Sequence, residues 1–182
     1  MTRLPYLDPD EAEPKVADLL GRIQPLGIFR IVAQAQRAFP HWLRMGGALL
    51  DPAEFDPVLR ELAILRVATL TPGADYEWVQ HVAIHRAVGG SAGQMRALRD
   101  GDVEAEALGQ DGRLVVGFTT QVVRDARPDD ETYAAMQARF TSREIVQLLL
   151  VIGQYMMIGR VMATVQIDLD PALNVLEPRR ED

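Results

Sequence analysis

Glu77 and His81 are ionisable residues whose types and spacing suit proton transfer. They are four residues apart, so on a helix their side chains lie about one turn apart on the same face. The carboxylate can orient the imidazole ring and stabilise its protonated form, and a histidine can move a proton near pH 7. The same spacing also occurs as a weak pair on helix surfaces, so the pattern fits both a catalytic unit and a structural pair.

Glu61 adds a second acid on the preceding segment, where apolar residues recur at helical spacing. Its neighbours on a helix are Val58, Ile64, Leu65 and Ala68. The opposite side of this helix is apolar too, so we expect the helix to be buried nearly all round. Burial raises the pKa of a carboxyl group, which could make Glu61 a proton donor or relay. The structural alternative is an ion pair with an arginine such as Arg60 or Arg66.

His85 continues the series that Glu77 and His81 begin, which raises the question of a metal site. Glu77 and His85 are two helical turns apart, roughly 12 Å at the rise of an α-helix. One ion cannot reach all three side chains at that separation, and a site with two ligands would need a further donor. We therefore predict neither a metal nor a cofactor.

The amino-acid composition indicates the class of fold that holds these side chains. The chain has 182 residues, of which 48% are apolar, 25% charged and 6% aromatic. These values indicate one folded domain rich in helix formers, so the predicted fold class is all-α. The net charge of −7 argues against a nucleic-acid partner. Cysteine is absent, which excludes disulfides and thiolate chemistry.

The predicted domain covers residues 1–182 and has four parts. They are an N-terminal arm (1–14), a first helical half with the site motif (28–100), a second helical half (113–167) and a tail (168–182). We expect a short helix over 11–21 and a helical run over 28–50 that Pro40 breaks. A polar linker is expected over 101–112.

Helix boundaries around the motif have strong local signals. Pro57 starts a helix that ends before Thr71-Pro72-Gly73, and the next helix stops at Gly89-Gly90. Capping-box patterns begin at Ser91 and Thr141, and a cap at Asp129 or Asp130 starts a helix through Ala138. Another helix is expected over 113–126.

The apolar segment from Ile145 to Met162 lies in the last predicted helix. Polar residues and glycines interrupt it, so we expect a core or interface helix and no membrane span. The first residues show no apolar run after their charges, so we expect a cytoplasmic protein.

The run Arg60–Leu65, followed after a short break by Tyr76-Glu77-Trp78, His81 and Gly89, resembles the signature of the carboxymuconolactone decarboxylase and AhpD-like family. In the AhpD-like peroxidases the second helix carries Cys-x-x-Cys-x-x-x-His. Aligned on His81 and Gly89, the cysteine positions fall on Ala74 and Glu77. The thiol peroxidase reaction is therefore disfavoured.

The decarboxylases of this family are similar to the chain in carrying Glu-x-x-x-His, which Glu77 and His81 reproduce. Glu61 falls where the peroxidases keep a glutamate proton relay. The resemblance implies an AhpD-like helical fold with a central helix pair and a homo-oligomer, a trimer or a hexamer. The sequence thus combines the Glu-x-x-x-His pattern of the decarboxylases with the relay glutamate of the peroxidases.

The expected function is cofactor-free acid/base chemistry on a small organic acid or lactone, by decarboxylation or a related lyase, hydrolase or isomerase step. His81 would move the proton, Glu77 would orient or assist it, and Glu61 would relay it. Four further residues are expected to contact the substrate: Tyr76, Trp78, Gln80 and His85. The alternative is a non-catalytic oligomeric ligand-binding protein on the same fold.

Overall fold

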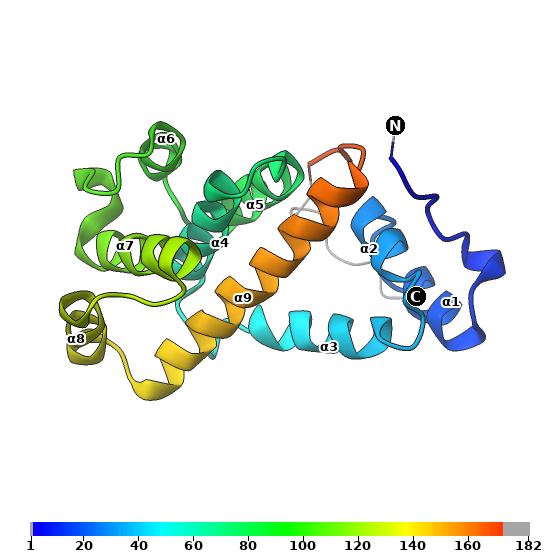
Figure 1. Ribbon diagram of the computed structural model, residues 1–182, viewed down its shortest axis with the longest axis horizontal. Coiled ribbons are helices and arrows are strands. Elements are labelled where there is room, and N and C mark those ends of the chain that lie inside the picture. The colour runs from blue at the N-terminus through cyan, green and yellow to red at the C-terminus, as the bar shows by residue number, and fades with distance from the viewer. Residues whose placement is uncertain (1, 173–182) are drawn as a thin grey trace.

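The computed structural model describes residues 2–172, and within this range the regular structure is entirely helical (Figure 1). The all-α prediction is confirmed. The α-helices are α1 (Pro14–Gly21), α2 (Gly27–Val32), α3 (Phe39–Leu49), α4 (Pro57–Leu70), α5 (Asp75–Ala87), α6 (Ala92–Asp100), α7 (Gly109–Asp125), α8 (Asp130–Arg139) and α9 (Ser142–Val165). Two short 3₁₀ helices, Pro9–Glu11 and Glu106–Leu108, complete the described part.

Helix α4 is the centre of the fold and packs against α5, α7 and α9 (Figure 1). Asp56 caps it by accepting a hydrogen bond from the Leu59 amide, and Pro57 occupies its first turn. Every residue from Arg60 to Ala68 is buried. The helix therefore has no solvent-facing stripe over this stretch, as its apolar sequence predicted.

Helix α5 follows α4 after a tight turn and runs beside it. Its end is fixed by Gly89, whose φ of 100° favours glycine. The predicted capping box then opens α6: Ser91 accepts from the Gln94 amide, and the Gln94 side chain accepts from the Ser91 amide. These local signals place α5 and α6 close to their predicted bounds.

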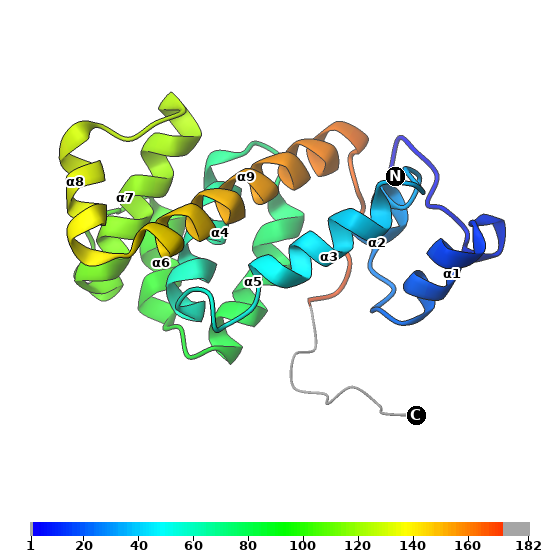
Figure 2. The same ribbon diagram turned by 90° about the horizontal axis from the view of Figure 1, so that it is seen from below.

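Helix α9 crosses the molecule between α1–α3 at one end and α7–α8 at the other (Figure 2). It starts at the predicted capping box of Thr141 and Glu144. Its length and mean hydropathy of 1.6 would suffice to cross a membrane, a property that core helices share, and 44% of the apolar window is buried in the protein. Apolar side chains of α9 also face outward: Val146, Leu149, Leu150 and Met157.

Two predicted boundaries are wrong. The break between α2 and α3 lies over residues 33–38, and Pro40 sits in the first turn of α3, where its missing N–H costs nothing. The linker expected over 101–112 ends early, because α7 begins at Gly109. The buried Leu108 side chain packs in an apolar cluster with Leu62 and Leu65, and this packing fixes the start of α7. Because the contact is a tertiary one, the polar sequence around Leu108 does not reveal it.

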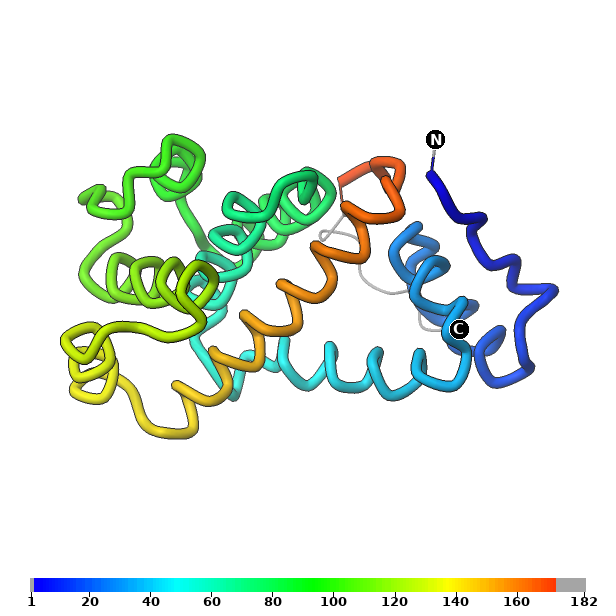
Figure 3. Tube along the Cα trace, in the orientation of Figure 1, coloured from blue at the N-terminus to red at the C-terminus, as the bar shows by residue number. Residues whose placement is uncertain are grey.

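The N-terminal arm lies alongside the segment after α9 (Figure 3). The Arg3 amide donates to the Val165 carbonyl at 2.7 Å, and the Tyr6 hydroxyl lies 3.2 Å from an Asp168 carboxylate oxygen. Asp168 of the predicted tail is thus held against the arm. Residues 173–182 of that tail lie outside the described residues.

Candidate functional site

A buried carboxylate–imidazole pair connects α4 to α5. His81 Nδ1 lies 2.7 Å from Glu61 Oε2, and the two residues are 7% and 0% exposed. The other oxygen, Glu61 Oε1, accepts from Arg60 Nε at 3.3 Å, and Arg60 Nη1 donates to the Leu50 carbonyl. Glu61 therefore joins a cation and an imidazole in a part of the fold closed to bulk water.

The hydrogen bond to Glu61 fixes the chemistry of the His81 ring. A carboxylate only accepts, so Nδ1 carries the proton and the neutral ring keeps its lone pair on Nε2. Tyr155 of α9 packs edge-on against this ring, with centroids 4.8 Å apart and an interplanar angle of 88°. An oriented imidazole with a free basic nitrogen can accept and return a proton.

Glu77 does not pair with His81, and the sequence prediction that it orients the ring is corrected here. The His81 partner is Glu61, on another helix. Glu77 is 2% exposed, and neither of its carboxyl oxygens has a hydrogen-bond partner within residues 2–172. Burial raises the pKa of Glu77 to about 8, so the group is mostly protonated at neutral pH. Its role is better described as a neutral acid than as an orienting carboxylate.

A glycine on α9 makes room for the Glu77 side chain. A Cβ atom at Gly159 would lie 3.2 Å from Glu77 Oε2 and 3.1 Å from Thr71 Cγ2. Tyr155, one turn earlier on α9, has a pKa raised by burial and then by the charges of Glu61 and Glu77. Glu61 and Glu77 therefore both influence Tyr155, the residue that packs against the His81 ring.

Tyr76 and Gln80, predicted to contact substrate, hold the segment after α9. The Tyr76 hydroxyl donates to Asp170 Oδ2 at 2.5 Å, and burial raises the pKa of this phenol. Gln80 Nε2 donates to the Pro171 carbonyl at 3.0 Å. In this structure both side chains fasten residues 170–171 to α5, a function that the sequence prediction did not include.

Trp78 and His85, also predicted to contact substrate, pack against other parts of the fold. Trp78 is half-buried beside Leu62 and Leu65, and the Arg99 guanidinium lies 5.2 Å from the centre of its indole ring. His85 is fully buried, and its Nε2 lies 3.1 Å from Gln94 Oε1. These contacts join α5 to α6.

The space beside His85 depends on the absence of a side chain at Gly90. A Cβ atom at Gly90 would lie 2.0 Å from the His85 ring. Burial lowers the pKa of His85, which favours its neutral form. Within residues 2–172, no cluster of three potential metal-ligating side chains includes these histidines.

Gln154 is a further buried polar group. It is 4% exposed, and in the described part of the chain neither its amide oxygen nor its amide nitrogen has a hydrogen-bond partner. Its nitrogen lies 4.0 Å from a Cβ built at Gly46, which places the amide between α9 and α3. The interrupted apolar pattern of α9 was the sequence signal that pointed to this residue.

Comparison with known proteins gives a family match over the part of the chain that contains the acid/base residues. No curated protein matches the chain. Residues 36–111 match the model of the carboxymuconolactone decarboxylase family, a segment that contains α4 and α5 and therefore Glu61, Glu77 and His81. Over this segment, the chain is therefore similar to the carboxymuconolactone decarboxylase family.

Proposed function

We propose that this protein is a carboxymuconolactone decarboxylase-like enzyme. It performs cofactor-free acid/base chemistry on a small organic acid or lactone. One observation carries the proposal: the buried Glu61–His81 hydrogen bond lies one helical turn from Glu77, a carboxyl group with no hydrogen-bond partner among the described residues. Such a group is unfavourable in a purely structural role, because a buried polar atom without a hydrogen bond costs stability.

The proposed proton transfer fits a decarboxylation. Breaking the bond between carbon and the carboxylate releases carbon dioxide and leaves an electron pair on the substrate, as a carbanion or enolate. A proton must then reach that carbon. Glu77, protonated at neutral pH with a pKa of about 8, is suited to donate it. His81 Nε2 can return a proton to the site, while Glu61 stabilises the imidazolium that forms on the way.

The absence of cysteine supports this assignment over a thiol peroxidase. The peroxidase reaction forms a disulfide between two cysteines, and the chain has none. Glu77, one of the two positions aligned with those cysteines, is instead a buried carboxyl whose pKa is raised to about 8 by burial. The same proton-handling groups would also serve a related lyase, hydrolase or isomerase step.

Replacing His81 with glutamine is expected to reduce carbon dioxide release from carboxymuconolactone at least ~100-fold, the usual contribution of a general acid or base. The measurement compares initial rates of the wild type and His81→Gln at equal concentration, after circular dichroism has shown that both are folded. His41→Gln is the matched control, because His41 is an exposed histidine on α3.

An unchanged rate in His81→Gln would remove His81 from the reaction. Failure of the folded wild type to release carbon dioxide would exclude this decarboxylation. Ligand binding without turnover across a panel of small acids and lactones would then favour the non-catalytic binding protein.

We also propose a homo-oligomer, a trimer or a hexamer, in the cytoplasm. The outward apolar side chains of α9 support an interface between copies of the chain. The proposed partner is a small-molecule substrate. The net charge of −7 supports the absence of a nucleic-acid partner.

A further inference from the structure

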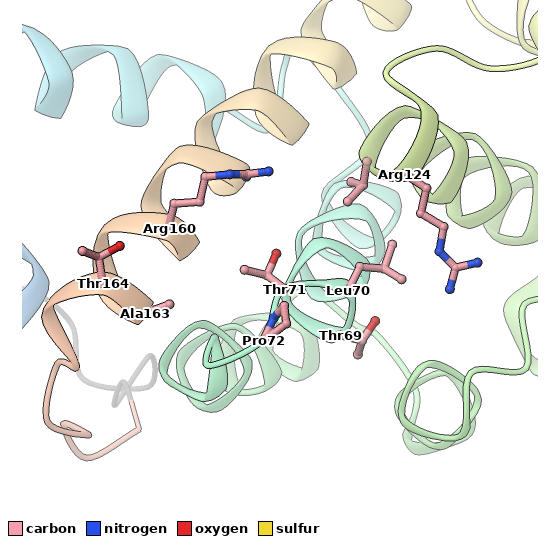
Figure 4. Close-up of a pocket in the computed structure, with 9 residues that line it drawn as sticks. Thr69, Leu70, Thr71, Pro72, Arg124, Arg160, Ala163 and Thr164 are labelled. Carbon is pink, nitrogen blue, oxygen red and sulfur yellow. The ribbon is translucent and has the colours of Figure 1, made fainter.

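An open groove of about 530 Å³ lies between the C-terminal ends of α4, α7 and α9 (Figure 4). It is lined by Thr69, Leu70, Thr71, Pro72, Val123, Arg124, Arg160, Ala163 and Thr164. None of the acid/base residues Glu61, Glu77 and His81 belongs to this lining. The groove is therefore a separate feature from the site described above.

Two arginines come to the groove from opposite walls. Figure 4 shows Arg160 extending from α9 towards α7, whereas Arg124 emerges from α7 beyond Leu70. Arg160 donates only to the Met156 carbonyl of its own helix, at 2.7 Å. Within residues 2–172, neither guanidinium forms an ion pair. Most of their N–H donors are thus available to a ligand.

A third arginine strengthens the positive charge beneath the groove. Arg66 is 6% exposed, and its Nε donates to Thr120 Oγ1 at 2.8 Å. Its Nη1 lies 3.5 Å from the hydroxyl of Thr69, a groove residue. In the described part of the chain Arg66 has no carboxylate partner. Its pKa is lowered by burial and then by the nearby charge of Arg124.

Four arginines outside the groove form ion pairs with acids, whereas others, such as the exposed Arg37, form none within residues 2–172. Arg22, Arg60, Arg139 and Arg143 each form an ion pair. Arg66, Arg124 and Arg160 thus bring three positive charges to the surroundings of one groove, in a chain with a net charge of −7. Arg66 is buried without a counterion among the described residues, so an anion bound near Thr69 would offset part of the cost of burying its charge.

We propose that this groove binds the anionic group of a small molecule, a phosphate or a carboxylate, at the arginines that line it, Arg124 and Arg160. Guanidinium groups suit both anions, because their planar N–H donors form two parallel hydrogen bonds with oxygen pairs. The exposed Thr164 hydroxyl, which makes no hydrogen bond with the described residues, adds a neutral donor on the same wall. The volume of the groove accommodates a small metabolite rather than a bare ion alone.

The test is a titration of the ¹⁵N-labelled full chain with inorganic phosphate and, separately, with succinate, at constant ionic strength. We expect saturable shifts of the backbone amides at 69–71, 123–124 and 160–164. Arg124→Gln and Arg160→Gln should each weaken binding about tenfold, the loss expected for one charge-assisted contact. Arg37→Gln removes the same charge from an exposed position outside the groove and should leave the affinity unchanged.

Saturation by phosphate alone or by succinate alone identifies which anionic group the site takes, and saturation by both indicates a general oxyanion site. Arg124→Lys and Arg160→Lys keep the charge but lose the paired donors, so they should bind with intermediate affinity and serve if a glutamine variant does not fold. Non-saturating shifts with both anions, or shifts equal in the wild type and the groove variants, would overturn the proposal. The wild-type turnover assay reports on the acid/base site independently.

Discussion

Glu61→Gln is expected to destabilise the protein by about 3 kcal/mol, the usual cost of breaking a buried ion pair from one side. The Glu61 carboxylate accepts from both Arg60 and His81 at a position that is 0% exposed. A glutamine amide has one acceptor oxygen, so one of these two donors would face an NH₂ group. Urea denaturation at pH 7 measures the difference in the free energy of unfolding.

The matched control is Glu54→Gln, because Glu54 pairs with Arg143 at the surface, where the arginine side chain is 73% exposed. Exposed pairs contribute little, so this variant should lose less than about 1 kcal/mol. Glu61→Gln should also lose turnover, because a neutral amide cannot stabilise a protonated His81 ring as the carboxylate does. Equal stability of the two variants would contradict the structural role given to Glu61.

Glu77→Gln is expected to gain stability relative to the wild type as the pH rises. The pKa of Glu77 is about 8 in the folded protein and near the ordinary 4.5 in the unfolded chain. Below pH 4.5 the carboxyl is protonated in both states and its ionisation costs nothing. Between 4.5 and 8 the unfolded chain ionises first, so the free energy of unfolding falls, and above 8 the loss is complete.

The size of this effect follows from the raised pKa. At ~1.4 kcal/mol for each pKa unit, the full loss is on the order of 5 kcal/mol. Glutamine does not ionise, so the stability of Glu77→Gln minus that of the wild type should increase between pH 5 and 8.5. Urea denaturation at several pH values measures this difference, and other titrating groups cancel in it. A flat or falling difference would show that Glu77 is not buried as a neutral acid.

The helical framework was largely predictable because its signals are local. Pro57 and Asp129 start helices, Gly89 ends one, and two capping boxes begin at Ser91 and Thr141. Each depends on hydrogen bonds within one turn of chain, so the sequence contains the whole cause. The start of α7 at Gly109 was missed because it depends on burial of Leu108, which is a tertiary contact.

The ionisable residues of the site could be predicted from the sequence, but the hydrogen bond between two of them could not. Helical spacing places Glu77 and His81 on one face of α5, yet it cannot determine which of them points towards α4. In the structure His81 bonds to Glu61 of α4, whereas Glu77 packs beside Gly159 of α9. The choice between these partners is made by packing between helices that are far apart in sequence.

The contacts of Tyr76 and Gln80 were hidden for a related reason. Both were predicted to face substrate because they flank the motif. Their partners, Asp170 and Pro171, lie about 90 residues further along the chain, in a segment whose prolines and acids indicated only a tail. Local sequence carries no signal for such a long-range contact.

The central claim is that a buried carboxyl next to the Glu61–His81 pair keeps its proton at neutral pH. Selective ¹³C labelling of the glutamate side-chain carboxyls, followed by an NMR titration from pH 3 to 10, tests it directly, with Glu77→Gln to assign the signal. We expect the Glu77 resonance to titrate with a midpoint near 8. A midpoint near the ordinary 4.5 of a glutamate would contradict the claim and remove the proton donor from the proposed reaction.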